Sequence, residues 1–469
     1  MVQLRRISYA TCFTLFIGSL AASPALAQAQ VSFPDRICNV KDYGAEGYRD
    51  YPETEAFQKA IDDCAAKGGG TVEVPRGWWY VGPLTLKSNI NFHIAQYADV
   101  HFATDPVLYG IGPDLAPLAG KREPGQPRNL FALIKITDAQ NVAITGEGIL
   151  DGQGYVWWEA IRKTLPAGGA ANQSGHAARP MMLLAARTKN FLLEGVTIMN
   201  APAFNVMLDH TEDVTIRKIT IQDPPSSPNT DAIDPFNSHN VLIEDNVISC
   251  GDDIVAIKAT GVNPAHPDAA VSNIVIRNNK IFAGHGISIG SDTSGGVKHV
   301  LIENNTFEGS FHGVRIKSRR GYGGEVSDIV IRNNKMKDVQ NVLTIAEYFQ
   351  YIPVDMRVPQ KLPKGAMLIV DLVYPADTDP AQPYAKNKTP YFHDITIDGL
   401  EATGAEAVGI VLGVPEKEIT NFTMKNVHIE SKTGLIVRNA TINAENTTIT
   451  SEDGKPIVLQ RHGRFKIAK

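Results

Sequence analysis

Four aspartates lie close together in the middle of this 469-residue sequence, and their surroundings suggest chemistry. Asp231 and Asp234 precede one strand-like segment, and Asp252 and Asp253 stand directly ahead of the apolar run 254–257. Adjacent aspartates usually mark a solvated turn, but desolvating a carboxylate beside an apolar strand costs several kcal/mol. Charges in such a place must be paired or functional, so we interpret the stretch as a candidate active site. For Asp234, three residues past Asp231, we expect a structural role.

Three residues further along have side chains that complement these carboxylates. His285 lies between two glycines, and Arg315 and Lys317 flank Ile316. Side chains two positions apart project to the same side of a strand, and a paired Arg and Lys can hold a carboxylate. Glycosidic bonds are cleaved by two carboxyl groups, one of them protonated, and crowding raises the pKa of at least one. The set therefore favours hydrolysis of an acidic polysaccharide, with His285 orienting the acid.

Short β-branched segments recur from about residue 133 onward, and they are the elements that must position these side chains. Four similar segments begin at residues 240, 273, 299 and 328, at intervals of about 30 residues. They continue as IEDN, IRNN, IENN and IRNN. A period of this length, with Asn-rich corners and few helical patterns, is typical of a parallel β-solenoid. We predict an all-β chain folded as a parallel β-helix.

The solenoid brings distant residues onto one face, because equivalent positions in successive coils stack about 4.8 Å apart. The interval from Asp231 to Asp253 fits one coil with short corners. Two longer intervals of equal length follow, from Asp253 to His285 and from His285 to Lys317, and each fits a coil with one longer corner. We therefore expect one stripe on four consecutive coils, formed by Asp231, Asp252, Asp253, His285, Arg315 and Lys317.

One helix is expected ahead of the strands, over Pro52 to Lys67, with its apolar residues on one face. Thr54 is a plausible N-cap, and glycines 68–70 end the helix. A single amphipathic helix before many strands suggests a cap over the open N-terminal end of the stack.

Two insertions rich in Pro, Gly and charge interrupt the repeats, at Asp105–Arg128 and Tyr351–Pro390. Long irregular segments on a rigid scaffold tend to form rims around binding clefts. The pair Trp157-Trp158 could stack on sugar rings there, although burial under a rim loop explains it equally well. The run Arg319-Arg320 is more simply interpreted as a solvated loop than as a substrate contact.

The N-terminal residues 1–27 have the pattern of a secretory signal peptide. Arg5 and Arg6 precede an apolar run from Cys12 to Leu20, and Ala25-Leu26-Ala27 provides a cleavage site. The run is too short to span a bilayer, so we expect a secreted or periplasmic protein with no membrane contact. Removing two cations takes the net charge from −5 to −7, which disfavours nucleic acid as a partner. Residues 28–469 are expected to form a single catalytic domain, and a monomer.

Three cysteines remain after the signal. Cys38 and Cys64 could pair in an oxidising compartment, and closing that loop would contribute about 3 kcal/mol in the chain-entropy model. The sequence leaves this pairing open. Cys250 is expected to be a small buried residue.

Four short motifs in this order resemble glycoside hydrolase family 28, the polygalacturonases. They are Asn229-Thr230-Asp231, Gly251-Asp252-Asp253, Gly284-His285-Gly286 and Arg315-Ile316-Lys317, and the resemblance extends over most of the mature chain. It implies a right-handed parallel β-helix that cleaves α-1,4-galacturonan with inversion and needs no metal or other cofactor.

The resemblance also implies roles for individual residues. Asp252 would be the general acid, Asp231 and Asp253 would activate water, and His285 would support the acid. Asn229 would orient the site. Binding of the galacturonate carboxylate would involve Arg315, Lys317 and a tyrosine one coil further on, for which Tyr348 matches better than the nearby Tyr351.

Other functions on the same scaffold stay open at this point. A rhamnogalacturonan or xylogalacturonan hydrolase would share the fold, although the Asp252-Asp253 pair and the Arg315/Lys317 pair favour pure galacturonan. A calcium-dependent pectate lyase would need an Arg base beside a carboxylate cage, and His285 argues against it. A noncatalytic polysaccharide-binding solenoid would have no need of the stripe. The insertions favour exo over endo action slightly, because they could wall off one end of a cleft.

Overall fold

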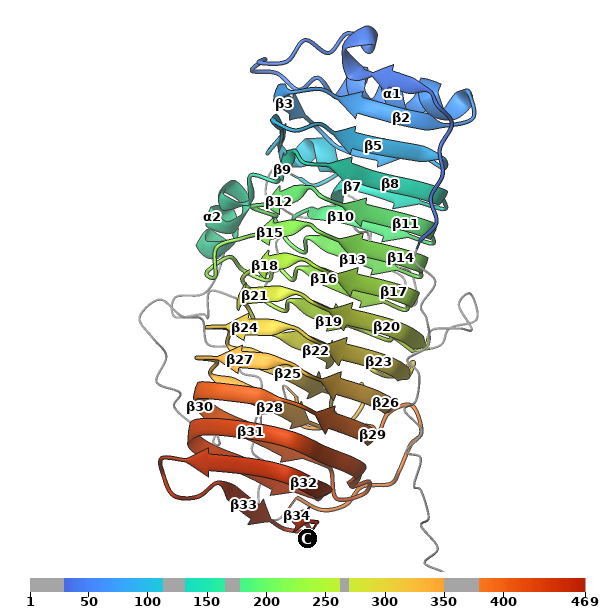
Figure 1. Cartoon of the computed structure of the whole chain (residues 1–469). Helices are drawn as coiled ribbons and strands as arrows, with labels where there is room; N and C mark the ends of the chain where they lie inside the picture. The colour runs from blue at the N-terminus through green and yellow to red at the C-terminus, as the bar shows by residue number, and fades with distance from the viewer. Residues whose placement is uncertain (1–28, 113–130, 165–177, 262–269, 350–378, 469) are drawn as a thin grey trace, which may run out of the picture.

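The computed structural model describes residues 29–112, 131–164, 178–261, 270–349 and 379–468. The predicted signal peptide, Tyr351 and most of both predicted insertions lie outside the described residues. Within them the chain winds as an elongated stack of coils, with the N-terminal strands at one end and the C-terminal strands at the other (Figure 1). All the paired strands are parallel, which confirms the predicted parallel β-helix.

Each regular coil contributes one strand to each of three parallel sheets, here called sheets 1, 2 and 3. Sheet 1 consists of β4 (Leu84–Leu86), β7 (Ala132–Thr137), β10 (Met181–Ala186), β13 (Val206–Asp209), β16 (Ile233–Phe236), β19 (Val255–Ile257), β22 (Ile287–Gly290), β25 (His312–Lys317), β28 (Asn341–Ala346) and β33 (Ile457–Gln460). Sheet 2 consists of β1 (Ile37–Asn39), β2 (Gly70–Val74), β5 (Ile90–Ile94), β8 (Gln140–Gly146), β11 (Lys189–Glu194), β14 (Glu212–Arg217), β17 (His239–Glu244), β20 (Val271–Arg277), β23 (Val297–Glu303), β26 (Glu325–Arg332), β29 (Tyr391–Asp398) and β34 (Arg464–Ile467).

Sheet 3 contains the third strand of each coil: β3 (Gly77–Val81), β6 (Ala98–Phe102), β9 (Ile149–Asp151), β12 (Thr197–Met199), β15 (Thr220–Gln222), β18 (Val247–Ser249), β21 (Lys280–Ala283), β24 (Thr306–Glu308) and β27 (Lys335–Lys337). Near the C-terminal end three longer strands bend from one sheet into the next: β30 (Glu401–Leu412), β31 (Ile419–Arg438) and β32 (Ala440–Ser451).

The Asn-rich corners between sheets 2 and 3 form a buried ladder of side-chain amides. Each amide Nδ2 donates to the Oδ1 of the next coil, at 2.9, 2.9 and 3.0 Å. The residue before each ladder position has φ between 53° and 59°, a region that Asn and Asp tolerate better than most residues. This explains the repeated IEDN, IRNN and IENN motifs, whose last residues are the ladder members Asn246, Asn279, Asn305 and Asn334.

The interior between the sheets is apolar and stacked in register. One column of sheet 2 contains isoleucines from five consecutive coils, each at most 1% exposed, and each buried Ile contributes about 1.5–3 kcal/mol. The column comprises Ile216, Ile243, Ile276, Ile302 and Ile331. Along every strand, side chains alternate between this interior and the outside. The strands of sheet 1 can therefore bury apolar side chains and present polar groups on their outer face.

Helix α1 (Thr54–Ala66) lies at the N-terminal end of the stack, beside the 3-10 helix η1 (Val40–Tyr43). It buries Phe57, Ala60, Ile61 and Cys64. The predicted N-cap is wrong by one residue, because Glu53 is the N-cap and Thr54 Oγ1 instead accepts a hydrogen bond from Gly82 N. That the helix serves as a cap stays a prediction.

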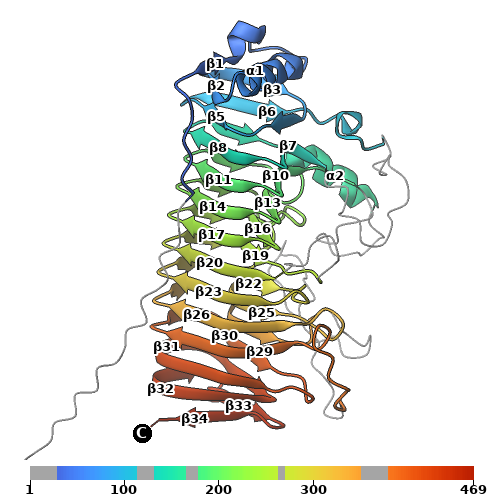
Figure 2. The same cartoon turned by 90° about the vertical axis from the view of Figure 1, so that its right-hand side faces the viewer.

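The other helices, η2 (Pro106–Tyr109) and α2 (Gly154–Thr164), were not predicted. Helix α2 protrudes from the side of the stack (Figure 2) and contains the tryptophan pair. Trp157 packs edge-on against Tyr109, and Trp158 Nε1 donates to Ala201 O. Both indoles are buried, so the burial alternative describes them.

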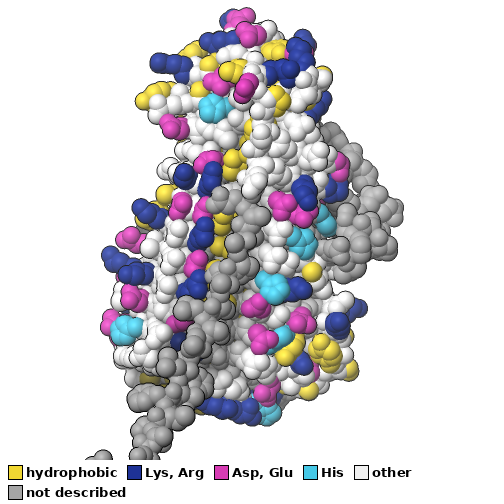
Figure 3. Space-filling model, turned by 45° about the vertical axis from the view of Figure 1, so that its right-hand side comes forward, with side chains coloured by type: hydrophobic (Ala, Val, Ile, Leu, Met, Phe, Trp, Pro, Cys, Tyr) yellow, Lys and Arg dark blue, Asp and Glu magenta, His cyan; other side chains and the backbone are white. Residues whose placement is uncertain are grey.

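The described cysteines Cys38, Cys64 and Cys250 are all free and buried. Burial is the largest cause that raises the pKa of Cys64 to about 12, and the Cys38 thiol adds to it. Cys38 and Cys64 therefore lie close together as thiols. No helix among the described residues is long and apolar enough to cross a membrane. Figure 3 shows cationic and anionic side chains interspersed over one face of the molecule.

Candidate active site

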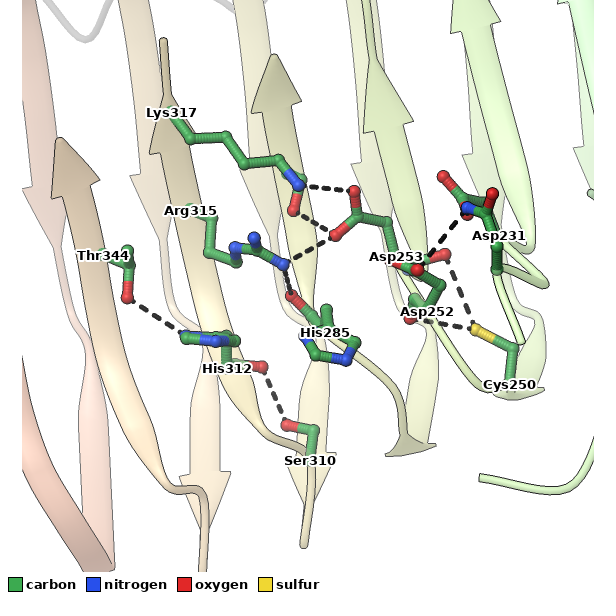
Figure 4. A network of polar contacts seen from close by, with 12 residues as sticks. Asp231, Cys250, Asp252, Asp253, His285, Ser310, His312, Arg315, Lys317 and Thr344 are labelled. Carbon is green, nitrogen blue, oxygen red and sulfur yellow. Dashed lines mark hydrogen bonds and ion pairs between the residues drawn. The ribbon is translucent and has the colours of Figure 1, made fainter. Parts of the chain in front are cut away.

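The predicted carboxylates and their partners meet on sheet 1 (Figure 4). Asp231 precedes β16, Asp252 and Asp253 precede β19, and His285 precedes β22. The register pairs Ile233 with Val255, and Val255 with Ile287. These pairings have the same separations along the chain as Asp231 to Asp253 and Asp253 to His285, so the first two predicted coils have the expected lengths.

The third predicted interval is wrong. Ile287 pairs with Val314, so this coil is shorter than the interval from His285 to Lys317 on which the prediction relied. The residue that follows His285 in register is consequently His312, whereas Lys317 lies opposite Gly290, further along the strand. Lys317 still reaches the carboxylates, because its long side chain extends back across two coils.

Asp253 is the charged centre of the site. It is 2% exposed, and it accepts hydrogen bonds from Arg315 Nη1 and Ser288 Oγ at one oxygen, both at 2.8 Å. Lys317 Nζ binds the other oxygen, also at 2.8 Å. Burial alone would raise the pKa of Asp253, but the charges of Lys317 and Arg315 outweigh it and hold the pKa well below its usual range. Asp253 is therefore an anion throughout the physiological range.

Asp231 has the opposite character. It is equally buried, and burial is the main cause that raises its pKa to about 7. The cation Lys258 opposes that rise, while Asp252 and Asp253 add to it. Lys258 Nζ lies 3.2 Å from Asp231 Oδ2 and 3.0 Å from Asp234 Oδ2, so it bridges two buried carboxylates. The site thus places a carboxyl that can hold a proton beside one that cannot.

Asp252 lies beside Asp231 and Asp253. It is half-buried and is the most accessible of these three carboxylates. Asn229 Nδ2 donates to Asp231 Oδ1 at 3.0 Å and reaches Asp252 Oδ2 at 3.5 Å. One oxygen from each of Asp231, Asp252 and Asp253 lies within 4.8 Å of the others. Among the described residues this is the carboxylate group that could hold a metal, but Lys258, Arg315 and Lys317 already supply positive charge to it.

His285 lies against this cluster because the glycines on either side allow an unusual backbone path. Gly284 and Gly286 have φ values of 116° and 71°, and a Cβ on Gly286 would lie 2.2 Å from Gly313 O. The His285 ring stacks on Phe311 with centroids 5.0 Å apart, and its backbone N donates to Asp252 O. Close coil packing therefore explains the Gly-His-Gly motif.

Comparison with known proteins fits this arrangement of carboxylates and cations on a parallel β-helix. The family model of glycosyl hydrolases family 28 matches residues 64–360, which is more than half of the chain. The chain belongs to glycosyl hydrolase family 28. It is therefore a member of a family of glycoside hydrolases.

Relatives of this family 28 chain include plant and bacterial proteins. A probable polygalacturonase of Vitis vinifera is 31% identical over 67% of this chain, which spans 64% of that relative's length. An endo-polygalacturonase of Pectobacterium carotovorum subsp. carotovorum is 28% identical, over 83% of this chain and 87% of its own. The crystal structure of a hyperthermoactive exopolygalacturonase from Thermotoga maritima has a TM-score of 0.69 and 25% identity, covering 92% of this chain and 93% of that one.

In this family 28 chain Tyr348 follows β28, one coil beyond Lys317 as the sequence predicts, because Lys317 pairs with Ala346. Its hydroxyl donates to Asp379 Oδ2 at 2.9 Å, and the side chain is 4% exposed. The next residue, Phe349, lies beside Lys317, whose Nζ is 5.0 Å from the ring centroid. The substrate contact expected of Tyr348 stays a prediction. Tyr351 lies outside the described residues.

Arg320 was interpreted as a solvated residue, and the structure contradicts this. Its guanidinium binds Glu416 through Nε and Nη2 and Asp379 through Nη1 and Nη2, at 2.6 to 3.1 Å. This group of ion pairs ties the loop after β25 to the chain that follows residue 378. Its neighbour Arg319 lies over the ring of Tyr322, 4.1 Å from the centroid.

The sequence reasoning missed four residues of the site: Lys258, Ser288, His312 and Arg179. Alternation along the strands could have found Lys258 and Ser288. Ser288 pairs with Arg315 and therefore faces outward as Arg315 does. Ala256 pairs with Ser288, and Lys258 lies two residues after Ala256, so Lys258 faces outward as well. His312 Nδ1 bonds Thr344 Oγ1 at 3.0 Å, and its ring lies 5.7 Å from that of His285. Arg179 precedes β10, and no spacing rule marks it.

Proposed function

We propose that this chain hydrolyses α-1,4-galacturonosyl linkages of galacturonan or pectin by acid–base attack of water. The observation that carries the proposal is the cluster in which Asp253 is held as an anion and Asp231 can hold a proton, with Asp252 beside them and with Arg315 and Lys317 on Asp253. A glycosidase needs a proton donor and an anionic carboxylate close together, and cations beside them suit an acidic sugar.

In this mechanism Asp252 protonates the leaving glycosidic oxygen. Its half-buried position supports the assignment, because Asp231 is 3% exposed and bound by Lys258. Asp253, anionic throughout, and Asp231 in its deprotonated form bind the attacking water, and Asp231 accepts the proton of that water as its oxygen bonds to the anomeric carbon. His285 positions Asp252 through its contact with the preceding coil, and Asn229 keeps Asp231 and Asp252 apart at a fixed distance.

Arg315 and Lys317 bind the carboxylate of the galacturonate unit next to the cleaved bond. Both cations are directed at Asp253, but an ammonium has three N–H donors and a guanidinium has five, so donors are left for a substrate oxygen. The third proposed ligand of this carboxylate is Tyr348, one coil further on, and Phe349 lies against Lys317.

The stereochemical outcome proposed is inversion. It rests on the family resemblance, whereas carboxyl oxygens within 4.8 Å are closer than the roughly 6.5–9.5 Å usual in inverting enzymes. In this proposal Asp231 and Asp253 bind the attacking water together. The water therefore does not have to fit between the acid Asp252 and a single base, which is a physical reason for the short distance between the carboxyl oxygens.

Exo action is the form of attack we infer. The ion pairs of Arg320 with Asp379 and Glu416 anchor the chain at the C-terminal side of the site, and we propose that the anchored chain limits this end of the binding site. An exopolygalacturonase is among the similar structures, but an endo-polygalacturonase is among the relatives, so product analysis decides. Monomer or dimer of galacturonate released first supports exo action, and mixed oligomers refute it.

The remaining parts of the proposal concern location, assembly and cofactors. We infer export by the N-terminal signal, a single domain over residues 28–469, a monomeric state, and no contact with membrane or nucleic acid. The reaction uses no metal. Incubation of the purified chain with polygalacturonate should give new reducing ends without the ultraviolet absorbance of unsaturated products, and EDTA should not stop it. Unsaturated ends would indicate a lyase, and binding without cleavage would indicate a noncatalytic module.

A further inference from the structure

A fourth cation faces the carboxylate cluster from the side opposite Arg315 and Lys317. Arg179 immediately precedes β10, and the strands of sheet 1 follow one another along the stack as β10, β13, β16, β19, β22 and β25 (Figure 1). Asp231 and the Asp252-Asp253 pair precede β16 and β19, whereas Arg315 and Lys317 lie on β25. The carboxylates therefore lie between Arg179 and the two cations of β25.

Backbone pairing fixes this placement. Met182 N donates to Phe204 O at 2.9 Å, and Asn205 N donates to Asp231 O at 2.8 Å. Arg179 thus leaves the backbone two coils from Asp231. Burial lowers the pKa of Arg179 to about 10, and the charges of Asp231 and Asp252 oppose that change. The guanidinium is accordingly a cation at neutral pH, within electrostatic reach of both carboxylates.

The three other cations of the site have protein partners, and Arg179 differs from them. Arg315 and Lys317 bind Asp253, and Lys258 binds Asp231 and Asp234. Arg179 forms no ion pair with a described residue, and its Nη1 is shielded from solvent without a hydrogen-bond partner in the described part of the chain. A shielded guanidinium N–H without an acceptor is costly, so an arrangement of this kind is suited to an anion that arrives with a ligand.

We propose that Arg179 binds the carboxylate of a second galacturonate unit. This unit lies across the scissile bond from the one held by Arg315 and Lys317, toward the N-terminal end of the β-helix. The inference rests on the proposed function and extends it to a second sugar. The planar guanidinium matches a carboxylate through two parallel hydrogen bonds, and a methyl ester can neither neutralise it nor accept both. Arg179 is therefore a specificity residue that selects an unesterified unit at this position.

The test compares Arg179→Gln with the unaltered chain on polygalacturonate and on a partially methyl-esterified pectin. Losing a charge-assisted pair should lower kcat/KM on polygalacturonate by about 10–100-fold, and on the esterified substrate by clearly less. Arg179→Lys keeps the charge but not the fork, and should fall between. The matched control is Arg187→Gln at the other end of β10, where an exposed guanidinium binds Asp138 and no effect is expected.

Other outcomes overturn the inference. Equal losses on both substrates, together with a shifted pH profile, would mean that Arg179 acts only by positioning Asp231 and Asp252. Unchanged kinetics would mean that it binds no substrate. Arg179→Lys supplies the same comparison if Arg179→Gln does not fold. If the unaltered chain cleaves neither substrate, the proposed function fails and this inference fails with it, whereas normal cleavage with an unchanged substrate ratio refutes the inference alone.

Discussion

Replacing Asp231 with asparagine should stabilise the protein near pH 8 while impairing catalysis. Asp231 is buried, and its pKa is raised from 3.8 to about 7, primarily by that burial. At about 1.36 kcal/mol per unit, ionising this carboxyl in the folded protein costs about 4 kcal/mol relative to the unfolded chain. Asparagine keeps the shape and removes the charge, so Asp231→Asn should recover up to about that amount.

The gain depends on pH with a defined sign. Between the unfolded pKa of 3.8 and the folded pKa of about 7, the folded protein binds more protons at Asp231 than the unfolded chain does. The contribution of Asp231 to stability is therefore most favourable below 3.8 and falls as the pH rises through this window. The difference in unfolding free energy between variant and parent should be near zero at about pH 4 and largest at about pH 8.

Asp253→Asn is the matched control, because the same chemical change should have the opposite effect. The pKa of Asp253 is held low by Lys317 and Arg315, so its charge stabilises the fold above the unfolded pKa and loses that effect only in strong acid. Removing the charge leaves two buried cations without their partner, which should cost about 3–5 kcal/mol near pH 8. Urea unfolding at both pH values measures all three proteins. Parallel shifts of the two variants, or a gain for Asp231→Asn that does not vary with pH, would refute the reasoning.

Three further predictions address the substrate, the cleft and the stereochemistry. Lys317→Ala should raise KM on polygalacturonate by about tenfold and raise it less on methyl-esterified pectin, and equal increases would remove its carboxylate-binding role. Arg320→Met should release the chain that Arg320 anchors through Asp379 and Glu416, so that mixed oligomers appear earlier among the products. An unchanged product profile would show that these ion pairs do not set the mode of attack. Proton NMR of the first product should show the β-anomer expected from inversion at an α-linkage, and an initial α-anomer would establish retention.

The fold could be predicted because its signals are local and repeated. The IEDN, IRNN and IENN motifs fix a positive-φ residue followed by a buried asparagine, and each coil repeats that requirement at Asn246, Asn279 and Asn305. Helix α1 was predictable from its own apolar face. The short helix α2 was not, because its two tryptophans are buried by contacts with Tyr109 and Ala201, which come from other parts of the chain.

The positions of the site residues could be predicted only where the lengths of the coils were predicted correctly. Asp231, Asp253 and His285 follow from two coils whose lengths were predicted correctly, but corners vary in length, and the next coil is shorter. Repeating the previous interval therefore aligned Lys317 where His312 stands. Arg179 starts two coils from Asp231 and acts on Asp231 and Asp252 through its charge, and such an influence leaves no spacing in the sequence.

The central claim is that Asp252 delivers the proton in galacturonan hydrolysis at this cluster. The most direct measurement is the turnover number of Asp252→Asn on polygalacturonate, with folding verified by its unfolding transition. A positioned general acid contributes about 10²–10⁴-fold, so turnover should fall by at least that range while the fold is retained. A folded Asp252→Asn protein with near-normal turnover would contradict the account.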